Sequence, residues 1–293
     1  MLGCGCLARG SFKSSKTSLS CGSSAILNGD PDKSVKVNGP VVCLGEVIID
    51  FVPVASGVSL AEAQAFKKAA GGAPANVAVG ISRLGGSSAF IGKACVFDPD
   101  ARTGLAFVTL TKDGEREFLL FRNPSAVMLL HEAELDVGLI KKPYGHPKSL
   151  LETGIMSVWA QADFIKISTE EITFLTKGED PNDDNVVRKK LFHPNLKLLL
   201  VSEGVKGILN GQVPSVKVNC VDATGAGDGF VAGILNILAS NLDLYKDEQR
   251  LREALRFANA CGALAVTERG AIPALPTRER VLQILPKVIT SKN

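Results

Sequence analysis

The first apolar run of the chain predicts a buried β-strand. Residues 41–53, "VVCLGEVIIDFVP", are almost continuously apolar and follow a polar stretch that ends near "KSVKVNGP". Such a run is typical of a strand covered on both faces. Asp50 marks the point where the run leaves the core. It is either a polar residue at a strand end or a ligand for substrate hydroxyls at the carboxyl edge of a sheet.

A helix is predicted directly after a pair of glycines. In "KKAAGGAPANVAVGISRLGGSSAFIGK" (67–93), Gly71-Gly72 forms a turn and Pro74 suits the first turn of a helix. Apolar residues then recur at helical spacing until Gly85-Gly86 ends the element. Asn76 lies on the first turn of this helix, where it either braces the loop or binds a sugar hydroxyl.

Two β-rich runs follow within residues 101–126, "ARTGLAFVTLTKDGEREFLLFRNPSA". Asp113-Gly114 between them is a strong hairpin signal. A hairpin that projects from an α/β core is suited to act as a lid. Arg122, near its end, is either a ligand for an anionic or hydroxylated molecule or a surface charge.

The stretch "VDATGAGDGFVAGIL" (221–235) places its smallest residues where an apolar helix begins. The first N–H groups of a helix have no intrahelical acceptor, and Gly225, Ala226 and Gly227 have no bulk to keep a phosphate from them. Asp228 follows inside the first turn, where a carboxylate beside a phosphate suits a role in proton transfer. The alternative is a tight strand-to-helix turn in which Asp228 only favours the helix start.

Composition excludes several classes of protein. The chain has 293 residues, 45% hydrophobic and 22% charged, and no apolar stretch long enough to span a membrane. The net charge of +3 is already supplied by Arg9, Lys13 and Lys16, and the other 30 basic residues are balanced by 30 acidic ones. The seven Cys form no CxxC pair and the three His lie far apart. We therefore expect no membrane, no nucleic acid and no zinc or disulfide framework.

The N-terminal segment has a different composition from the rest. The first 29 residues contain seven Ser, three basic residues and no acidic residue, without an apolar stretch of secretory length. Residues 1–38 are therefore read as a plastid transit peptide, or as a disordered tail of a cytosolic protein. Either way we exclude them from the fold and expect a chloroplast location, with the cytosol as the alternative.

Two of these segments carry a family resemblance. "GGAPANVAVGISRLGGSSAFIGK" and "DATGAGDGF" resemble the two signature regions of the ribokinase-like PfkB carbohydrate kinases, in the right order. "GEVIIDFVP", "FRNPSA", "NLKLLLVSEG" and "FANACGALAVTERGAIPALPT" resemble plant fructokinases in particular. The resemblance implies a ribokinase-like α/β three-layer sandwich over residues 39–293, with a central, mostly parallel sheet and a small β lid built on a hairpin at about 101–124.

The resemblance also implies a reaction and its residues. The reaction is ATP-dependent phosphorylation of fructose, or of a similar small sugar, to the 6-phosphate, with Asp228 as catalytic base. Gly225, Ala226 and Gly227 would form the anion hole. The sugar would be bound by Asp50, Gly71, Gly72, Asn76 and Arg122. Members of this family also suggest a homodimer formed through the lid.

Nucleotide and cation ligands follow from the same resemblance. Ser202, Gly204 and Asn259 correspond to ATP contacts. Ser168 and Glu171 of "KISTEEITFL" resemble an Asn-x-x-Glu element in a serine form, in which Glu171 helps to hold Mg²⁺ through water; a solvated acidic helix start is the alternative. Asp222 and Thr224, with carbonyls near Ala265 and Gly270, resemble a loop for a monovalent cation such as K⁺.

The chain also departs from the family pattern at three places. The usual Gly-Asp-Asp continuation after "FIGK" is absent, a strand, a helix and another strand are missing after Lys142, and the strand after "VSEG" is shortened. These losses predict an incomplete sheet. They also favour one alternative function, a catalytically impaired paralogue with a binding or regulatory role, against which the intact Asp228 argues. A second alternative, a PfkB kinase for another small substrate, stays open because the sequence does not determine the sugar.

Overall fold

The structure is a computed structural model that describes residues 40–55, 57–92, 102–110, 116–122, 125–126, 159–160, 162–203 and 213–290. It gives backbone alone for 110, 116–118 and 286–290. The N-terminal segment 1–38 and Gly204 lie outside the described residues. The predictions made for them therefore stay predictions.

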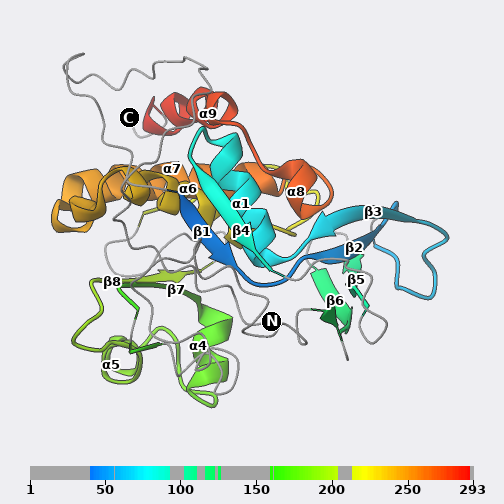
Figure 1. The fold of residues 1–293 in the computed structure, drawn as a ribbon, viewed down its shortest axis with the longest axis horizontal. Coiled ribbons are helices and arrows are strands. Elements are labelled where there is room, and N and C mark those ends of the chain that lie inside the picture. Colours follow the sequence, from blue (N-terminus) through cyan, green and yellow to red (C-terminus); the bar gives the residue numbers. More distant parts are fainter. Residues whose placement is uncertain are drawn as a thin grey trace.

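A four-stranded sheet lies to one side of the molecule (Figure 1). Its strands are β2 (Ile48–Pro53), β3 (Phe66–Gly71), β5 (Gly104–Leu110) and β6 (Arg116–Phe121), in the order β3-β2-β5-β6. β2 and β5 are parallel, whereas β3 and β6 pair antiparallel with their neighbours. β5 and β6 are joined through residues 111–115, and the predicted Asp113-Gly114 turn falls in that part, outside the described residues.

The prediction of one buried strand over residues 41–53 is wrong. They form two strands in two different sheets, β1 (Val41–Leu44) and β2, not one. The chain bends at Gly45, which packs against the ring of Pro74 so closely that a Cβ would overlap it. Asp50 therefore lies in the middle of β2, with its side chain 2% exposed, and not at a strand end on the edge of a core sheet.

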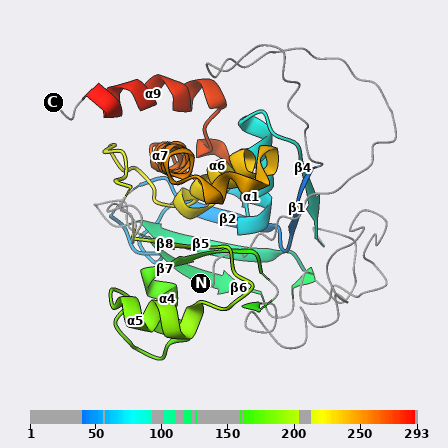
Figure 2. The same ribbon diagram turned by 90° about the vertical axis from the view of Figure 1, so that its left-hand side faces the viewer.

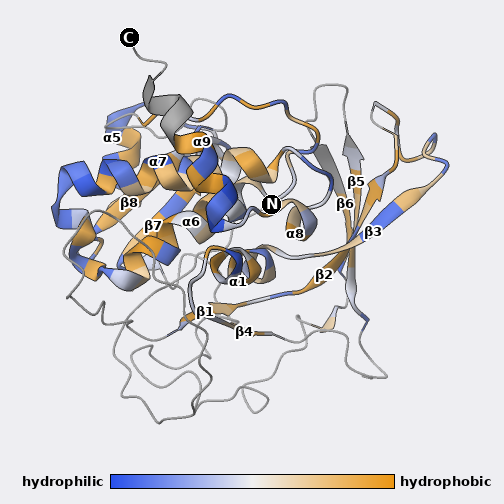
Figure 3. Cartoon of the chain, turned by 90° about the horizontal axis from the view of Figure 1, so that it is seen from above, coloured by the Kyte–Doolittle hydropathy of each residue, from blue (hydrophilic) through white to orange (hydrophobic). Residues whose placement is uncertain are grey.

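The sequence pattern also missed β3. Lys67 and Lys68 make "FKKAAG" look polar, and both side chains are exposed. Lysines are common on edge strands because they discourage pairing with another chain. Figure 3 shows this strand with a blue, hydrophilic section at the edge of the sheet.

The remaining described strands form two separate parallel pairs. β1 pairs with β4 (Ser88–Ile91), and β7 (Phe164–Ser168) pairs with β8 (Leu198–Ser202). Within the described part of the chain no strand is hydrogen-bonded to both pairs. The predicted mostly parallel sheet is thus present as two parallel pieces, as expected if strands between them were lost.

Helices lie on both sides of the β7–β8 pair (Figure 2). One layer consists of α1 (Ala73–Arg83), α6 (Ala226–Ser240), α7 (Glu248–Ala265) and α9 (Arg278–Thr290), with the short α8 (Ala271–Ala274) and the 3₁₀ helix η5 (Leu242–Lys246). The other consists of α4 (Thr169–Leu175), α5 (Asp184–Val186) and the π-helix η3 (Val187–Leu191). The arrangement confirms the predicted three-layer α/β architecture.

The described core falls into two main clusters. The larger one gathers α1, α6, α7, β1 and Leu200 of β8. The smaller one gathers β7, α4, η3 and Val201 of β8. Since successive side chains of a strand point to opposite faces, β8 lies between the two helical layers.

Two further findings concern the described residues alone. None of their helices is both long and apolar enough to cross a membrane. Nor does that part of the chain hold a group of three or more His, Cys, Asp or Glu side chains able to bind a metal ion.

Candidate active site

The N-terminus of α6 lies at the residues predicted to form a phosphate cradle. Its N-cap, Gly225, has φ 86°, and a Cβ there would lie 2.9 Å from the Cβ of Ala271. Left-handed backbone and a close neighbour both favour glycine at this position. Among the described residues, a Cβ on Gly227 would meet one atom within 4 Å, the Nζ of Lys166 at 3.7 Å. Within the part of the chain that the structure describes, the first turn of α6 is therefore open on the side of Gly227.

Asp228 lies in this first turn and contacts a residue from the other end of the chain. The Nδ2 of Asn76, on α1, donates a hydrogen bond of 2.7 Å to the Oδ2 of Asp228. Asn76 is 4% exposed, and its Oδ1 has no hydrogen-bond partner among the described residues. The structure thus joins the predicted base to a predicted sugar ligand, and leaves a buried acceptor beside them.

Asp50 approaches the same place from the sheet. Gly71, at the end of β3, lies so close to Asp50 that a Cβ there would overlap its carboxylate. Gly72 follows as the N-cap of α1, with φ 103°, and its carbonyl accepts a hydrogen bond of 2.9 Å from the backbone N of Asn76. Asp50, Gly71, Gly72, Asn76 and Asp228 therefore form one continuous line of contacts from the sheet to α6.

Arg122 follows β6 and is held by an acid that the sequence analysis missed. Its Nη1 donates to the Oε1 of Glu46 at 2.5 Å, with the Arg122 side chain 40% and the Glu46 side chain 19% exposed. Glu46 also supplies the carbonyl oxygen that a Cβ on Gly72 would overlap. The one signal for Glu46 in the sequence is that it interrupts the apolar run 41–53.

Glu171 takes part in a capping box at the start of α4. The Oγ of Ser168 accepts from the backbone N of Glu171 at 3.2 Å, and the backbone N of Ser168 donates to the Oε2 of Glu171 at 2.8 Å. This reciprocal pair fixes the Glu171 carboxylate at the carboxyl end of β7. The predicted Ser-x-x-Glu element is therefore a helix start, and its acid is oriented by that start.

The charges near this element affect Glu170. Its burial is the largest influence and raises the pKa of the carboxyl group. Hydrogen bonds from its own backbone, Ser168 and Thr169, together with the positive charge of Lys166, outweigh burial and leave the pKa of Glu170 below its usual value.

The predicted nucleotide ligands lie in two places. Ser202 ends β8 directly opposite Ser168 of β7, at the carboxyl edge where both strands stop. Asn259, on α7, is 6% exposed, and its Nδ2 donates to the carbonyl oxygens of Val213 at 2.9 Å and Pro214 at 3.2 Å. Asn259 therefore braces the chain at 213–214.

Asp222 fastens the loop that precedes the cradle. Its side chain is fully buried; Oδ1 accepts from the backbone N of Thr224 at 2.9 Å and Oδ2 from that of Gly270 at 2.7 Å. The backbone of 221–222 also donates to the carbonyl of Val266. Thr224 is 5% exposed, and its Oγ1 has no hydrogen-bond partner in the described part of the chain.

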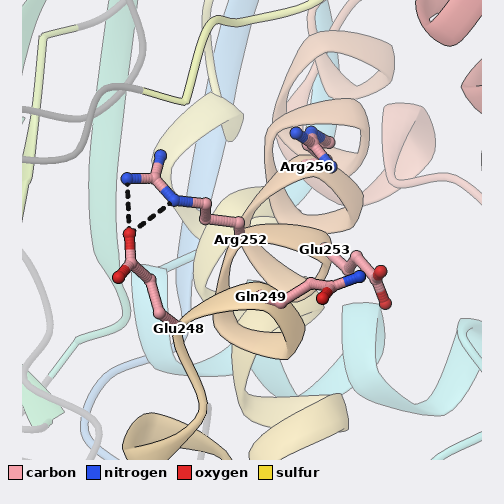
Figure 4. A pocket seen from close by; sticks show the side chains of 5 residues that line it. All are labelled: Glu248, Gln249, Arg252, Glu253 and Arg256. Atoms are coloured by element: carbon pink, nitrogen blue, oxygen red, sulfur yellow. Dashed lines mark hydrogen bonds and ion pairs between the residues drawn. The ribbon is translucent and has the colours of Figure 1, made fainter.

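A shallow surface pocket lies elsewhere (Figure 4). It is lined by Glu248, Gln249, Arg252, Glu253 and Arg256, all from the first turns of α7. α6 runs about 22 Å away from the cradle before η5 reverses the chain into α7. Within the pocket, Arg252 and Glu248 form an ion pair of 2.8 Å, which is typical of an exposed helix face. The pocket is therefore not part of the candidate site.

Comparison with known proteins shows which family this chain is similar to. A family model described as "pfkB family carbohydrate kinase" matches residues 39–95 and 142–278 of this chain. "Probable fructokinase-6, chloroplastic" of Arabidopsis thaliana is 53% identical over 88% of this chain and 85% of its own length. "Fructokinase-2" of Zea mays is 42% identical over 85% of this chain and 95% of its own.

Solved structures of fructokinases are similar to this chain in fold as well. A fructokinase from Vibrio cholerae, in a form with fructose, ADP and calcium bound, has TM-score 0.67 and 28% identity, covering 83% of this chain and 98% of its own. A fructokinase from Xylella fastidiosa with bound ATP has TM-score 0.66 and 28% identity over 85% and 98%. The alignment with the first Arabidopsis relative spans 328 positions, more than the 293 residues of this chain, so segments of that relative have no counterpart here.

Proposed function

Because this chain belongs to the pfkB family of carbohydrate kinases, we propose that it transfers the γ-phosphoryl group of ATP to the primary hydroxyl of fructose, giving fructose 6-phosphate and ADP. The observation that carries the proposal is the hydrogen bond between Asn76 and Asp228. It holds a carboxylate at the start of α6 and beside a buried amide oxygen that has no donor among the residues the structure describes.

Asp228 and the cradle divide the chemistry between them. Asp228 accepts the proton of the sugar hydroxyl as that oxygen attacks the γ-phosphorus, and the bond to the β,γ-bridging oxygen breaks. The backbone N–H groups of Gly225 and Gly227 donate to the oxygens of the transferred group, where negative charge is spread in the transition state. The N–H of Ala226, which donates to the carbonyl of Ala223 at 3.3 Å in the structure, joins them by exchanging that long bond for a phosphoryl oxygen. Asn76 orients the carboxylate for this step.

The sugar lies, in this proposal, against the line of contacts from Asp50 to Asp228. A sugar hydroxyl that donates to the Oδ1 of Asn76 would satisfy a buried acceptor, whose burial without a partner is costly. Gly71 and Gly72 leave no side chain in the way, and Asp50 is positioned to accept from further hydroxyls. Arg122, held by Glu46, closes this side from the four-stranded sheet β3-β2-β5-β6, here called the lid sheet.

ATP would lie across the carboxyl ends of β7 and β8, with Ser202, Gly204 and Asn259 as predicted contacts. The Glu171 carboxylate fits Mg²⁺, which proteins usually hold through one or two carboxylates, waters and substrate phosphates. Bound Mg²⁺ would neutralise charge on the β- and γ-phosphates. Asp222 fits a monovalent cation only indirectly: both its oxygens accept backbone N–H groups, so it would orient the carbonyls of the loop at Thr224 and Gly270.

The proposal is tested by measuring ADP release with fructose, glucose, ribose, ketodeoxygluconate and adenosine as acceptors. We expect the highest kcat/KM with fructose. Equal or higher kcat/KM with another acceptor would assign the chain to another substrate of this family.

A second candidate is a nucleotide-binding protein with little turnover. It is favoured by the separation of β1–β4 from β7–β8 and by the segments of the relatives that have no counterpart here. In that case the chain would bind ATP, and no acceptor in the panel would stimulate ADP release above the rate with ATP alone.

For assembly, we propose that a second copy of this chain covers the outer face of the lid sheet. Phe107 stacks on Phe51 at 4.9 Å and meets Phe66 and Phe121 edge-on at 5.7 Å. Leu119 and Phe121, on the same face, are 50% and 55% exposed. Contiguous apolar surface of this kind is typical of an interface. Sedimentation equilibrium should show a dimer that Phe121→Ser weakens; a monomeric wild-type chain would exclude it.

For location, we propose import into plastids, because residues 1–38 are Ser-rich and basic and one relative is named chloroplastic. Residues 1–38 fused to a fluorescent protein should place it in plastids. Diffuse cytosolic fluorescence would contradict this.

A further inference from the structure

Lys166 is a charged residue at the cradle that has no role in the predicted site. It lies in the middle of β7, whose side chains alternate between the buried Ile165 and Ile167 and the half-buried Phe164, Lys166 and Ser168. Phe164 contacts the ring of Tyr245, just beyond α6. The face of β7 that carries Lys166 is therefore turned toward α6, and the ammonium group lies beside Gly227.

Two opposite charges in the first turn of α6 act on this ammonium group: the carboxylate of Asp228, next to Gly227, and the helix start itself. The start of a helix carries a partial positive charge, which repels an ammonium group. Within the described residues no hydrogen bond and no ion pair to a carboxylate involves Lys166; its charge acts on Glu170 only through space. Thr224, one residue before the N-cap of α6, adds a buried hydroxyl without a hydrogen-bond partner among these residues. The start of α6 therefore has, besides the Asp228 carboxylate, an ammonium group at Gly227 and a hydroxyl one residue before the N-cap, both able to donate to a bound anion.

We propose that Lys166 binds the γ-phosphate of ATP and stabilises the transferred phosphoryl group, which rests on the proposed phosphotransfer function. Gly227 adjoins Asp228, so the group that receives the sugar oxygen lies at this part of the cradle. The three outer oxygens of that group carry the charge in the transition state, and an ammonium at Gly227 neutralises part of it. Lys166 also links β7, which ends at Ser168 and the Mg²⁺ candidate Glu171, to the cradle on α6.

The γ-phosphate distinguishes this role from a general effect of charge. ATP carries that group and ADP does not. A lysine that contacts it selects ATP over ADP, whereas a lysine that supports β7 or attracts nucleotides at long range acts on both alike. Binding can be measured without sugar and without turnover, so the test does not depend on whether fructose is the acceptor.

The experiment is calorimetric titration of the full chain with ATP and with ADP, each with Mg²⁺. Lys166→Met keeps the length of the side chain and removes its charge; we expect it to weaken ATP about 10- to 100-fold, as for loss of a charge-assisted hydrogen bond, and ADP less than about threefold. Lys166→Arg should restore most of the preference for ATP. Lys189→Met, at an exposed position of η3, is the matched control and should equal wild type.

Equal losses for ATP and ADP, or no loss for either, would overturn the proposal. Should Lys166→Met fail to fold, labelling of the wild-type chain with a small amine reagent decides instead: ATP must protect Lys166 and ADP must not. A wild-type chain that binds ATP without phosphorylating any acceptor refutes the proposed activity and leaves this test of Lys166 intact. One that binds no nucleotide refutes both.

Discussion

The layer of α1, α6 and α7 and the unit formed by β7, β8 and α4 differ in how completely they are packed. In the first, Gly80 of α1 lies against Ala232 of α6, and Gly233 of α6 against Ala258 of α7, so closely that an added Cβ would come within 2.6–2.8 Å of them. In the second, Ile172 and Leu191 are buried, but Phe174 and Phe192 are 68% and 51% exposed. The base and its cradle thus belong to the better packed of the two regions.

This difference in packing indicates which part of the site the missing segments affect. Asp228 is positioned by α1 and α6, which contact each other directly, as α6 also does with α7, the helix of Asn259. The predicted ligands Ser202 and Glu171 instead depend on β7 and β8, which have no described hydrogen-bonded connection to β1 and β4. Loss of strands between the pairs therefore leaves the base intact and affects how the nucleotide is placed against the sugar.

The largest effect is expected from the base itself. Asp228→Asn keeps the shape of the cradle and can still accept from Asn76, but removes the proton acceptor, so turnover should fall by about 100-fold or more while ATP affinity is unchanged. Asp243→Asn, on the exposed η5, removes a carboxylate far from the cradle and should leave turnover as it is. If Asp228→Asn kept more than a tenth of the wild-type rate, the chemistry would not depend on this half of the molecule as we propose.

A matched pair of core truncations tests whether the two regions unfold together in one cooperative transition. Leu238 in the larger cluster is 1% exposed and Ile172 in the smaller one 0%. Truncation of either to Ala should cost about 2–5 kcal/mol where its cluster unfolds. We expect Leu238→Ala to lower the free energy of global unfolding, and Ile172→Ala mainly to speed hydrogen exchange in α4, β7 and β8. Equal shifts of one cooperative transition would show that the regions unfold together.

Restoring the missing segments should make the β7–β8–α4 unit more completely packed, and so more similar to the layer of α1, α6 and α7. A chain that carries the relatives' segments after Lys93 and Lys142 should melt at a higher temperature, because buried strands regain cover and paired edges. Its rate with fructose should rise about 100-fold, since misplacement of substrates alone costs a factor of that size. Gly/Ser segments of equal length are the control. No difference between the natural and the restored chain would mean that the losses do not damage the core.

The sequence indicated the parts of the site that local chemistry determines. Glycines without side chains and an acid at a helix start mark the cradle and Asp228, and Gly71-Gly72 with Pro74 mark the start of α1; both helices begin where those residues are. These features depend on backbone rules that act within a few residues. They hold whichever segments are missing elsewhere.

Other features depend on contacts between distant residues. The bend at Gly45 arises from packing on Pro74, so the apolar run 41–53 gave no sign that it feeds two sheets. Arg122 is paired with Glu46, and Lys166 lies beside Gly227, across 76 and 61 positions of sequence respectively. No local pattern contains such neighbours, and the roles of Glu46 and Lys166 therefore emerged only from the structure.

The smallest effect concerns the capping box that holds Glu171. Ser168→Ala removes the acceptor for the backbone N of Glu171 and should destabilise the start of α4 by about 1 kcal/mol, seen as faster hydrogen exchange at residues 169–171. Because the same box orients the Glu171 carboxylate, the Mg²⁺ concentration for half-maximal activity should rise, with the rate at saturating Mg²⁺ reduced less than tenfold. Ser168→Thr keeps the hydroxyl and should behave as wild type. Ser240→Ala, at the exposed last residue of α6, loses only a 3.3 Å bond to the carbonyl of Asn236 and should change neither quantity. An unchanged Mg²⁺ requirement in Ser168→Ala, with α4 measurably frayed, would mean that the capping box supports the helix alone and that the poorly packed region does not position the cation.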